Sequence, residues 1–352
     1  MRRALTFDDV ALVPKYNNVA SRTEPDLSTW LTRNIKVGMP LVPANMDTVM
    51  GTQLAEIIVK NGGVPIFHRF TNFETQKKWV EQFEGKVILS CGVNKFDEIS
   101  SLIDLRPLGL LIDVAHGHSD RMVRLVKQTK DAYPAVEVIA GNICTGRAYH
   151  DLVNAGADAV KVGIGPGAAC TTRVVTGFGV PQFTAIRDCA EEAIHLRVPI
   201  IADGGIRNSR DVVLALAAGA STVMIGKLFA LTEESAAEKR GPSPGIYSVG
   251  DTIEAGRFSI PEIPTKQAKY RGQASEDFQN EYYGGLKEKT VAEGTGFWAP
   301  VSGSAQALID GLLGGLRSGL TYGGARSIKE LQRKAEFVEV TGSYMTESFP
   351  RR

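Results

Sequence analysis

The sequence has few cysteines, and they lie far apart along the chain. The four cysteines are Cys91, Cys144, Cys170 and Cys189, and they form no CxxC pair and no metal-ligand spacing. We therefore expect free thiols rather than a disulfide framework. Because free thiols persist in reducing compartments, we expect a cytoplasmic protein.

An excess of charge and long apolar segments are also missing. The 40 Lys and Arg residues against 39 Asp and Glu residues give a net charge of +1, which supports neither a nucleic-acid-binding surface nor an anionic-membrane surface. No apolar run approaches the length that spans a bilayer. The opening MRRALTFDDV carries two arginines with no apolar segment behind them, so we expect no signal peptide.

What the sequence contains is an alternation of short apolar runs and amphipathic stretches. Hydrophobic residues make up 43% of the chain and charged residues 22%, as in soluble globular proteins. The apolar runs lie at Pro40–Ala44, Val64–Phe67, Val87–Ser90, Gly109–Ile112, Val136–Ala140, Ala159–Val162, Pro199–Ala202 and Ser221–Ile225. The helical patterns between them include Thr52–Lys60, Asp120–Tyr133, Ala148–Ala155, Thr184–His195 and Ser209–Ala218. Near-continuous apolar strands that alternate with helices predict a parallel sheet covered by helices.

Eight such units predict an α/β fold of the (β/α)8 TIM-barrel type rather than a doubly wound sheet. We expect residues 1–352 to form a single catalytic barrel domain with an extended loop region after the eighth strand. Residues 240–302 are rich in glycine, proline and charge, and we expect a mobile loop or flap there. Helices are expected to resume at Ala305–Leu313 and, after the glycine-rich Ser318–Gly324, at Ser327–Ala335.

Polar residues and glycines follow the apolar runs, at the strand ends where barrel enzymes carry their active sites. The side chains placed there are, in chain order, Asn45, Met46, Asp47, His68, Arg69, Cys91, Asp113, Asn142, Asp203 and Lys227. Their convergence on one end of the barrel predicts a single active site.

The segment KVGIGPGAACTTRVVTGFG, from Lys161 to Gly179, leaves the sixth apolar run and carries a cysteine. Its early glycines allow backbone conformations and close approaches that a side chain would block, so the loop suits a monovalent cation or a phosphate. A cysteine is usually a buried packing residue. The sequence TTR that follows Cys170, however, makes a poor core and a good thiolate environment. We therefore interpret this segment as a nucleophile loop.

Two glycine-containing strand ends suggest a phosphate site. Asp203 is followed by Gly204 and Gly205 directly before a helical stretch, and Gly226 precedes Lys227 one unit later. Glycine N–H groups at a helix N-terminus favour a phosphate, and barrels commonly bind one after strands seven and eight. The alternatives are a plain turn in which Asp203 caps the helix, and a solvated surface lysine at Lys227.

The pattern GPGxxCTTRxxTGxGxPQ closely resembles the active-site loop of the IMP dehydrogenase/GMP reductase family. The resemblance extends over residues 5–340, and the CBS insertion that many dehydrogenases carry is absent between Phe67 and Val87. It implies a cysteine that attacks C2 of a purine nucleotide, GMP or IMP, and a hydride that moves between C2 and a nicotinamide. A catalytically silent nucleotide-binding barrel would be expected to have lost that cysteine.

The resemblance also implies roles for individual residues. Cys170 is the expected nucleophile, Thr172 and Glu293 are expected to assist at C2 and at the base, and Asp113 completes the expected catalytic set. The expected substrate-binding residues are Met46, Asp203, Gly204, Gly205, Gly226, Lys227, Tyr270 and Gly272, with Asp203 on the ribose. We assign to the cofactor Arg69, Ser90, Asp113 and Asn142, and to a potassium ion the carbonyls of Gly165, Gly167 and Cys170. Ala168 departs from the phosphate-binding serine of many relatives.

The two reactions of the family differ in whether water must be activated. In the dehydrogenases of the family, the base that activates water resembles an Arg-Tyr pair on a mobile flap, whereas residues 274–293 here contain no arginine. The stretches GQASEDFQ, Ala44–Val49 and His68–Phe70 resemble reductases as well. We therefore expect NADPH-dependent reduction of GMP to IMP and ammonia, with IMP dehydrogenation to XMP as the alternative. Relatives suggest a homotetramer.

Overall fold

The structure is a computed structural model that describes residues 2–348 except 94–95, 242–246, 249–262 and 265. Its central sheet contains β4 (Leu41–Pro43), β5 (Ile66–Phe67), β6 (Ile88–Cys91), β7 (Gly109–Asp113), β8 (Glu137–Ile143), β9 (Ala159–Val162), β10 (Ile200–Asp203) and β11 (Thr222–Ile225). Neighbours in sequence pair in parallel from β5 to β11, and β11 pairs back with β4. The predicted (β/α)8 barrel is confirmed, and each strand overlaps one of the predicted runs.

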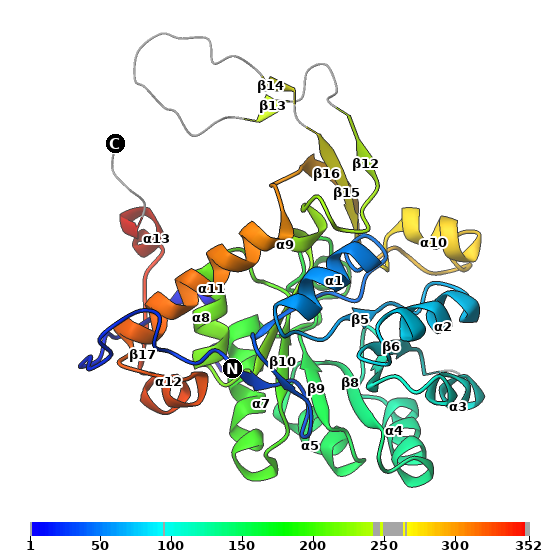
Figure 1. Ribbon diagram of the computed structural model, residues 1–352, viewed down its shortest axis with the longest axis horizontal. Helices are drawn as coiled ribbons and strands as arrows, with labels where there is room; N and C mark the ends of the chain where they lie inside the picture. The colour runs from blue at the N-terminus through cyan, green and yellow to red at the C-terminus, as the bar shows by residue number, and fades with distance from the viewer. Residues whose placement is uncertain (1, 94–95, 242–246, 249–262, 265, 349–352) are drawn as a thin grey trace.

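Helices surround this sheet (Figure 1). They are α1 (Thr52–Lys60), α2 (Phe73–Gln82), α3 (Phe96–Asp104), α4 (Asp120–Ala132), α5 (Gly146–Asn154), α6 (Thr172–Thr176), α7 (Gln182–Leu196), α8 (Ser209–Ala217) and α9 (Lys227–Ala230). Helix α4 shows how the sequence sets them: the Ser119 side chain accepts a hydrogen bond from the Met122 N–H at its start. Its buried Leu125 and Val126 lie on the face towards the strands, as the 3.6-residue period requires.

One predicted boundary is wrong. Helix α11 runs from Ala305 to Tyr322, so it continues through the glycine-rich segment that was expected to end it near Leu313. The glycines are needed for packing, because a Cβ at Gly315 would lie 2.2 Å from the Ser209 side chain, and one at Gly319 would lie 2.7 Å from Val213. Both contacts are with α8, so glycine brings these two helices close together. The next helix, α12 (Ile328–Lys334), matches its prediction.

The region after β11 adds a small antiparallel sheet to the barrel. Strands β12 (Lys239–Arg240), β15 (Gln267–Arg271) and β16 (Gly296–Pro300) pair in the order β12-β15-β16, and α10 (Glu276–Tyr283) lies between β15 and β16 in sequence. A two-stranded pair joins β13 (Tyr247–Ser248) and β14 (Ile263–Pro264). In Figure 1 the three-stranded sheet stands in the upper part of the view, below β13 and β14 and near α9 and α10. Residues 242–246, 249–262 and 265 of the expected flap lie outside the described residues.

The two ends of the chain meet beside α8. A short 3-10 helix, η1 (Phe7–Asp9), leads into β1 (Val10–Leu12), which pairs antiparallel with β17 (Phe337–Glu339). Helix α13 (Ser343–Ser348) follows β17, and β2 (Thr29–Trp30) pairs with β3 (Lys36–Val37) before the barrel begins. The N-terminal segment thereby closes against elements from the end of the chain.

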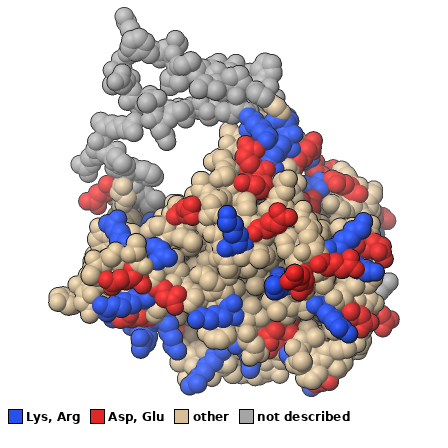
Figure 2. Space-filling view, viewed as in Figure 1, with Lys and Arg blue, Asp and Glu red and all other residues tan. Residues whose placement is uncertain are grey.

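Surface charge and helix hydropathy agree with the composition. Figure 2 shows basic and acidic side chains interspersed over the visible face. Among the residues that the structure describes, no helix is both long and apolar enough to cross a membrane.

Candidate active site

A cavity of about 600 Å³ lies at the carboxyl ends of the barrel strands. The strand-end loops line it together with residues from β15, α10 and the segment before β16. Of the predicted site residues it is lined by Met46, Arg69, Asp113, Asn142, Gly165, Gly167, Cys170, Thr172, Asp203, Gly204, Gly205, Gly226, Lys227, Tyr270, Gly272 and Glu293. The structure therefore brings sixteen of the seventeen predicted positions, all except Ser90, to one cavity.

The cysteine loop is held in shape by an arginine from its own sequence. Gly163 has φ +151°, and a Cβ there would lie 2.0 Å from the Asp203 carbonyl, so only glycine fits. The Arg173 guanidinium donates to the Ile164 carbonyl at 3.0 Å and to the Val180 carbonyl at 2.5 Å. Arg173 thus joins the two ends of the loop and leaves its middle, with Cys170, facing the cavity.

Cys170 lies beside the Thr172 side chain and close to the backbone of Glu293 and Gly294. Its thiol donates to Thr172 Oγ1 at 3.3 Å. The Thr171 N–H donates to the Glu293 carbonyl at 2.9 Å, and Cys170 forms a bridge with Gly294. The segment around Glu293 is therefore fixed to the cysteine loop by its backbone. An exposed thiol at the cavity, next to a hydroxyl, has the geometry of a nucleophile with a proton donor beside it.

A buried lysine that the sequence analysis did not single out lies under the cavity. Lys161 is 3% exposed, and its ammonium lies 3.0 Å from Asp113 Oδ1 and 2.8 Å from Asp203 Oδ2. It also donates to the Asn142 side chain. The only signal in the sequence is a charged residue inside an otherwise apolar run, which is unusual for a buried strand.

The lysine fixes the charge of the polar groups around it. Burial by itself would raise the pKa of the Asp113 carboxyl, but the Lys161 ammonium and a hydrogen bond from Asn45 at 2.9 Å lower it below the ordinary value. Burial would likewise lower the pKa of Lys161, yet the Asp113 and Asp203 carboxylates raise it. The lysine stays charged, and Asp113 is an ionised acceptor for ligand hydroxyls.

The residues assigned to the cofactor do not all reach the cavity. Asn142 lines it and donates to Asp203 Oδ2 at 2.9 Å. Arg69 lines it with its guanidinium 4.5 Å from the centre of the Phe70 ring. Ser90 is fully buried and does not line the cavity; its hydroxyl accepts a hydrogen bond from Asn45 at 3.2 Å. Ser90 therefore lies behind Asn45, which donates hydrogen bonds to both Ser90 and Asp113.

The glycine loops after β10 and β11 leave room for a ligand group. Gly204 and Gly205 have φ of +88° and +81°, which residues with side chains rarely adopt. A Cβ at Gly226 would lie 2.5 Å from the Tyr270 hydroxyl, so glycine permits the tyrosine to reach this loop. Lys227 is exposed, with its ammonium 5.5 Å from the Phe297 ring centre. Backbone N–H groups, a phenol and a lysine together suit an anionic group.

An arginine next to α10 also escaped the sequence analysis. Arg271 is 5% exposed and donates to Asp47 and Glu281, the latter at 2.5 Å. Burial opposes its charge, but the hydrogen bonds that it donates to Glu281 and Asp47 raise its pKa. Its guanidinium also lies 5.3 Å from the Phe278 ring centre. Arg271 therefore fastens α10 to the loop after β4 and remains charged.

The carbonyl groups assigned to a potassium ion form a hard, uncharged donor set. The Gly167 carbonyl accepts the Cys170 N–H at 3.0 Å, which leaves its second lone pair for another partner. Such oxygens fit a monovalent cation better than a transition metal. Among the described residues, no cluster of three or more His, Cys, Asp or Glu side chains is placed to hold a metal.

The fold and the cavity are those of a barrel enzyme with a cysteine at its active-site end. Residues 4–351 match the model of a family described as the IMP dehydrogenase / GMP reductase domain. Inosine-5'-monophosphate dehydrogenase of Borreliella burgdorferi is 37% identical, over 99% of this chain and 97% of that protein. GMP reductase 1 of Homo sapiens is 35% identical, over 97% of this chain and 96% of that protein. GMP reductase of Ascaris suum is 34% identical, over 96% and 93%.

The chain belongs to the IMP dehydrogenase/GMP reductase family. It is therefore an oxidoreductase that acts on purine nucleotides with a nicotinamide cofactor. Relatives of both names resemble it to nearly the same degree, so overall identity does not choose between the two reactions.

Proposed function

We propose that this chain is a GMP reductase, which converts GMP to IMP and ammonia with NADPH as hydride donor. The observation that carries the proposal concerns the segment between β15 and β16, which contains α10 and could supply an arginine to activate water. Residues 274–293 contain none. Arg271, beside α10, is bound to two carboxylates that raise its pKa, so it is a poor base.

The reaction begins at the thiol. The Cys170 thiolate attacks C2 of GMP, the bond from C2 to the exocyclic nitrogen breaks, and ammonia leaves after taking up a proton. Thr172, 3.3 Å from the sulfur, and Glu293 deliver that proton. When bound, NADPH would supply a hydride to C2, and loss of the Cys170 thiolate would then break the C2–S bond and release IMP. GMP, NADPH and protons thus give IMP, NADP⁺ and ammonium.

The remaining residues bind and orient. Asp203 accepts hydrogen bonds from the ribose hydroxyls, and its carboxylate is held for that purpose by Lys161 and Asn142. The Gly204–Gly205 and Gly226–Lys227 loops take the phosphate with Tyr270, while Met46 and Gly272 border the nucleotide. Arg69, Asp113 and Asn142, which line the cavity, would hold the cofactor.

Three further assignments belong to the proposal. A potassium ion bound by the carbonyls of Gly165, Gly167 and Cys170 would fix the conformation of the cysteine loop. The enzyme acts in the cytoplasm, and it assembles as a homotetramer. Size-exclusion chromatography with light scattering and an activity titration with potassium chloride against sodium chloride test the assembly and the ion.

The chemistry is tested by ammonia release from GMP in step with NADPH oxidation. Glu293→Gln is expected to slow ammonia release by about 10²–10⁴-fold, the usual size of a general-acid contribution, while GMP binding is retained. Glu288→Gln is the matched control, because Glu288 is an exposed residue of the same segment. Equal rates in the Glu293 variant and the control would contradict the role of Glu293. Wild-type enzyme that releases no ammonia from GMP would contradict the function.

The second candidate is the dehydrogenase reaction, which turns IMP and NAD into XMP. The 37% identity to a protein named as a dehydrogenase favours it. It would require a water-activating base in residues 276–289 or at Arg69. Arg69 qualifies because it lines the cavity and its Nε has no hydrogen-bond partner among the described residues.

A further inference from the structure

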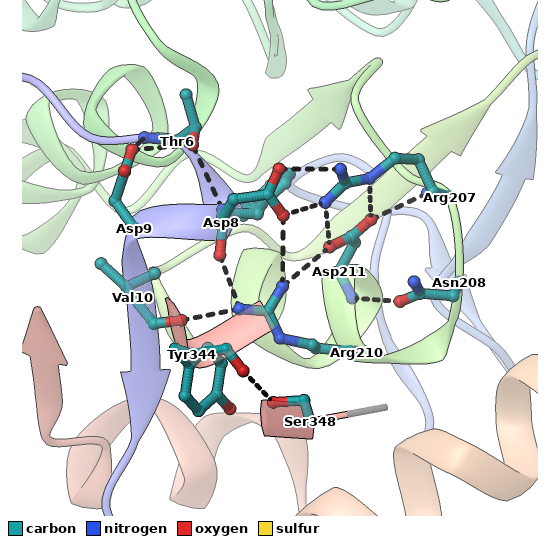
Figure 3. A network of polar contacts seen from close by, with 11 residues as sticks. Thr6, Asp8, Asp9, Val10, Arg207, Asn208, Arg210, Asp211, Tyr344 and Ser348 are labelled. Carbon is teal, nitrogen blue, oxygen red and sulfur yellow. Dashed lines mark hydrogen bonds and ion pairs between the residues drawn. The ribbon is translucent and has the colours of Figure 1, made fainter. Parts of the chain in front are cut away.

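A polar network joins the N-terminal turn to the loop that follows β10 (Figure 3). The Asp8 carboxylate accepts two hydrogen bonds from Arg207, from Nη1 at 2.9 Å and from Nη2 at 2.6 Å. Arg207 also donates to Asp211 in α8, from Nε at 2.9 Å and from Nη2 at 3.2 Å. Asp211 is fully buried, so this end of the network is fixed. Arg207 therefore connects the loop after β10 to Asp8 in the N-terminal turn and to Asp211 in α8.

Arg207 lines the active-site cavity but does not offer its charge to a ligand. Four of its side-chain hydrogen bonds go to the two carboxylates, and the Asp8 bonds are foremost in raising its pKa. A guanidinium that already faces two carboxylates is a poor partner for a phosphate. Its role is therefore to hold the loop rather than to bind the substrate.

The N-terminal turn is itself held firmly in place. Phe7 is 3% exposed, and a Cβ at Gly205 would lie 3.5 Å from its ring, so the ring packs under that glycine. Arg210 of α8 donates to the Phe7 carbonyl at 2.8 Å and to the Val10 carbonyl at 2.9 Å. The Leu5 N–H donates to Thr184 of α7 at 2.7 Å. The turn is thus held by contacts with α7 and α8, and it packs against the loop after β10.

We propose that Asp8 is a positioning residue that, through Arg207, holds the Gly204–Gly205 loop in the shape that takes the substrate's phosphate. Gly204 and Gly205 both have positive φ, and glycine restricts the backbone less than any other residue, so contacts from outside the loop are needed to fix its conformation. We call the Asp8–Arg207 pair, which supplies such a contact, the brace. The inference rests on the proposed placement of the phosphate at this loop. It gives the N-terminal turn, which contributes no group to the cavity, a part in substrate affinity.

The experiment compares binding of GMP with binding of guanosine, which lacks the phosphate, by calorimetry. Asp8→Asn is expected to weaken GMP binding about fivefold, the scale of a partly exposed ion pair, and to leave guanosine binding unchanged. Asp8→Glu keeps the carboxylate and is expected to restore GMP affinity. Asp120→Asn is the matched control, because it breaks an exposed ion pair with Arg124 on α4.

The outcomes separate the brace from the phosphate assignment. Equal loss of GMP and guanosine affinity in Asp8→Asn, or no loss at all, would overturn the proposal that Asp8 positions the phosphate loop. Wild-type enzyme that binds guanosine as tightly as GMP would overturn the phosphate assignment, and the brace with it. If Asp8→Asn does not fold, Arg207→Lys decides, since it keeps the charge and loses the paired geometry. A selective loss of GMP affinity there supports the brace.

Discussion

At the scale of single residues, burial distinguishes the four cysteines. Cys91 and Cys189 are fully buried, and burial raises the pKa of both thiols, which makes them inert. Cys144 is half-buried, and burial raises its pKa as well. Cys170 is exposed at the cavity. The cysteine that the loop sequence predicted as nucleophile is therefore the one with access to a substrate.

Cys170→Ala is expected to abolish turnover and to leave nucleotide affinity nearly unchanged. Covalent catalysis needs the thiolate, whereas the groups that face ribose and phosphate lie on other loops. Steady-state rates and nucleotide titrations measure the two effects, and Cys144→Ala should keep full turnover. Substantial activity in the Cys170 variant would contradict the assignment of Cys170 as the nucleophile.

Lys161→Met is expected to weaken nucleotide binding and to destabilise the protein by about 3–5 kcal/mol, because it leaves two carboxylates beside the cavity without their partner. Lys130→Met is the matched control, since it breaks the Lys130–Asp158 pair, at 2.8 Å, away from the cavity. Both variants should lose stability in urea, but only Lys161→Met should lose nucleotide affinity. Equal affinities would show that Lys161 has a structural role only.

His68 should make stability depend on pH. Burial lowers the pKa of His68 to about 4 from an ordinary 6.5, so the folded state binds fewer protons than the unfolded state between these values. Stability should be full above pH 6.5 and fall as the pH drops towards 4, by about 3 kcal/mol at most. Urea unfolding across this range should show the slope, and His68→Gln should flatten it. An identical slope in both proteins would exclude His68 as its source.

At the scale of elements, the barrel strands were predictable because parallel strands are buried on both faces and therefore form continuous apolar runs. Helix α10 was not predicted, although Ser275 caps it and Gly284 ends it in the left-handed region. The eight residues of α10 lie in a region that is otherwise rich in glycine and charge, which masks the short helical signal. The predicted end of α11 near Leu313 is wrong because its glycines pack against α8 and do not end the helix.

The two neighbouring glycines of α11 give a matched test of this packing. Gly315→Ala is expected to destabilise the protein by about 1–3 kcal/mol, because its Cβ would overlap Ser209 on α8. Gly314→Ala is expected to stabilise it by about 0.5–1 kcal/mol, since nothing lies within 4 Å of that Cβ and alanine favours the helix. Urea unfolding midpoints measure both. Equal shifts would mean that α11 does not need glycine against α8.

At the scale of the whole molecule, the sequence predicted the residues at the strand ends but not the contacts between them. Strand-end positions follow from the fold, so Asp113, Asn142 and Asp203 could be placed at one end of the barrel in advance. Lys161 could not, because its role depends on two carboxylates that are 48 and 42 residues away in sequence. The Arg271–Asp47 pair, which spans 224 residues, was hidden for the same reason.

The central claim is that this enzyme reduces GMP, because residues 274–293 contain no arginine to activate water. The most direct test gives purified enzyme IMP with NAD in one reaction and GMP with NADPH in another, and follows nicotinamide absorbance and XMP. The account predicts sustained NADPH oxidation with ammonia release on GMP. On IMP it predicts at most one hydride transfer per active site, with accumulated Cys170 adduct and no XMP. Steady XMP production from IMP, with no NADPH consumed on GMP, would contradict it.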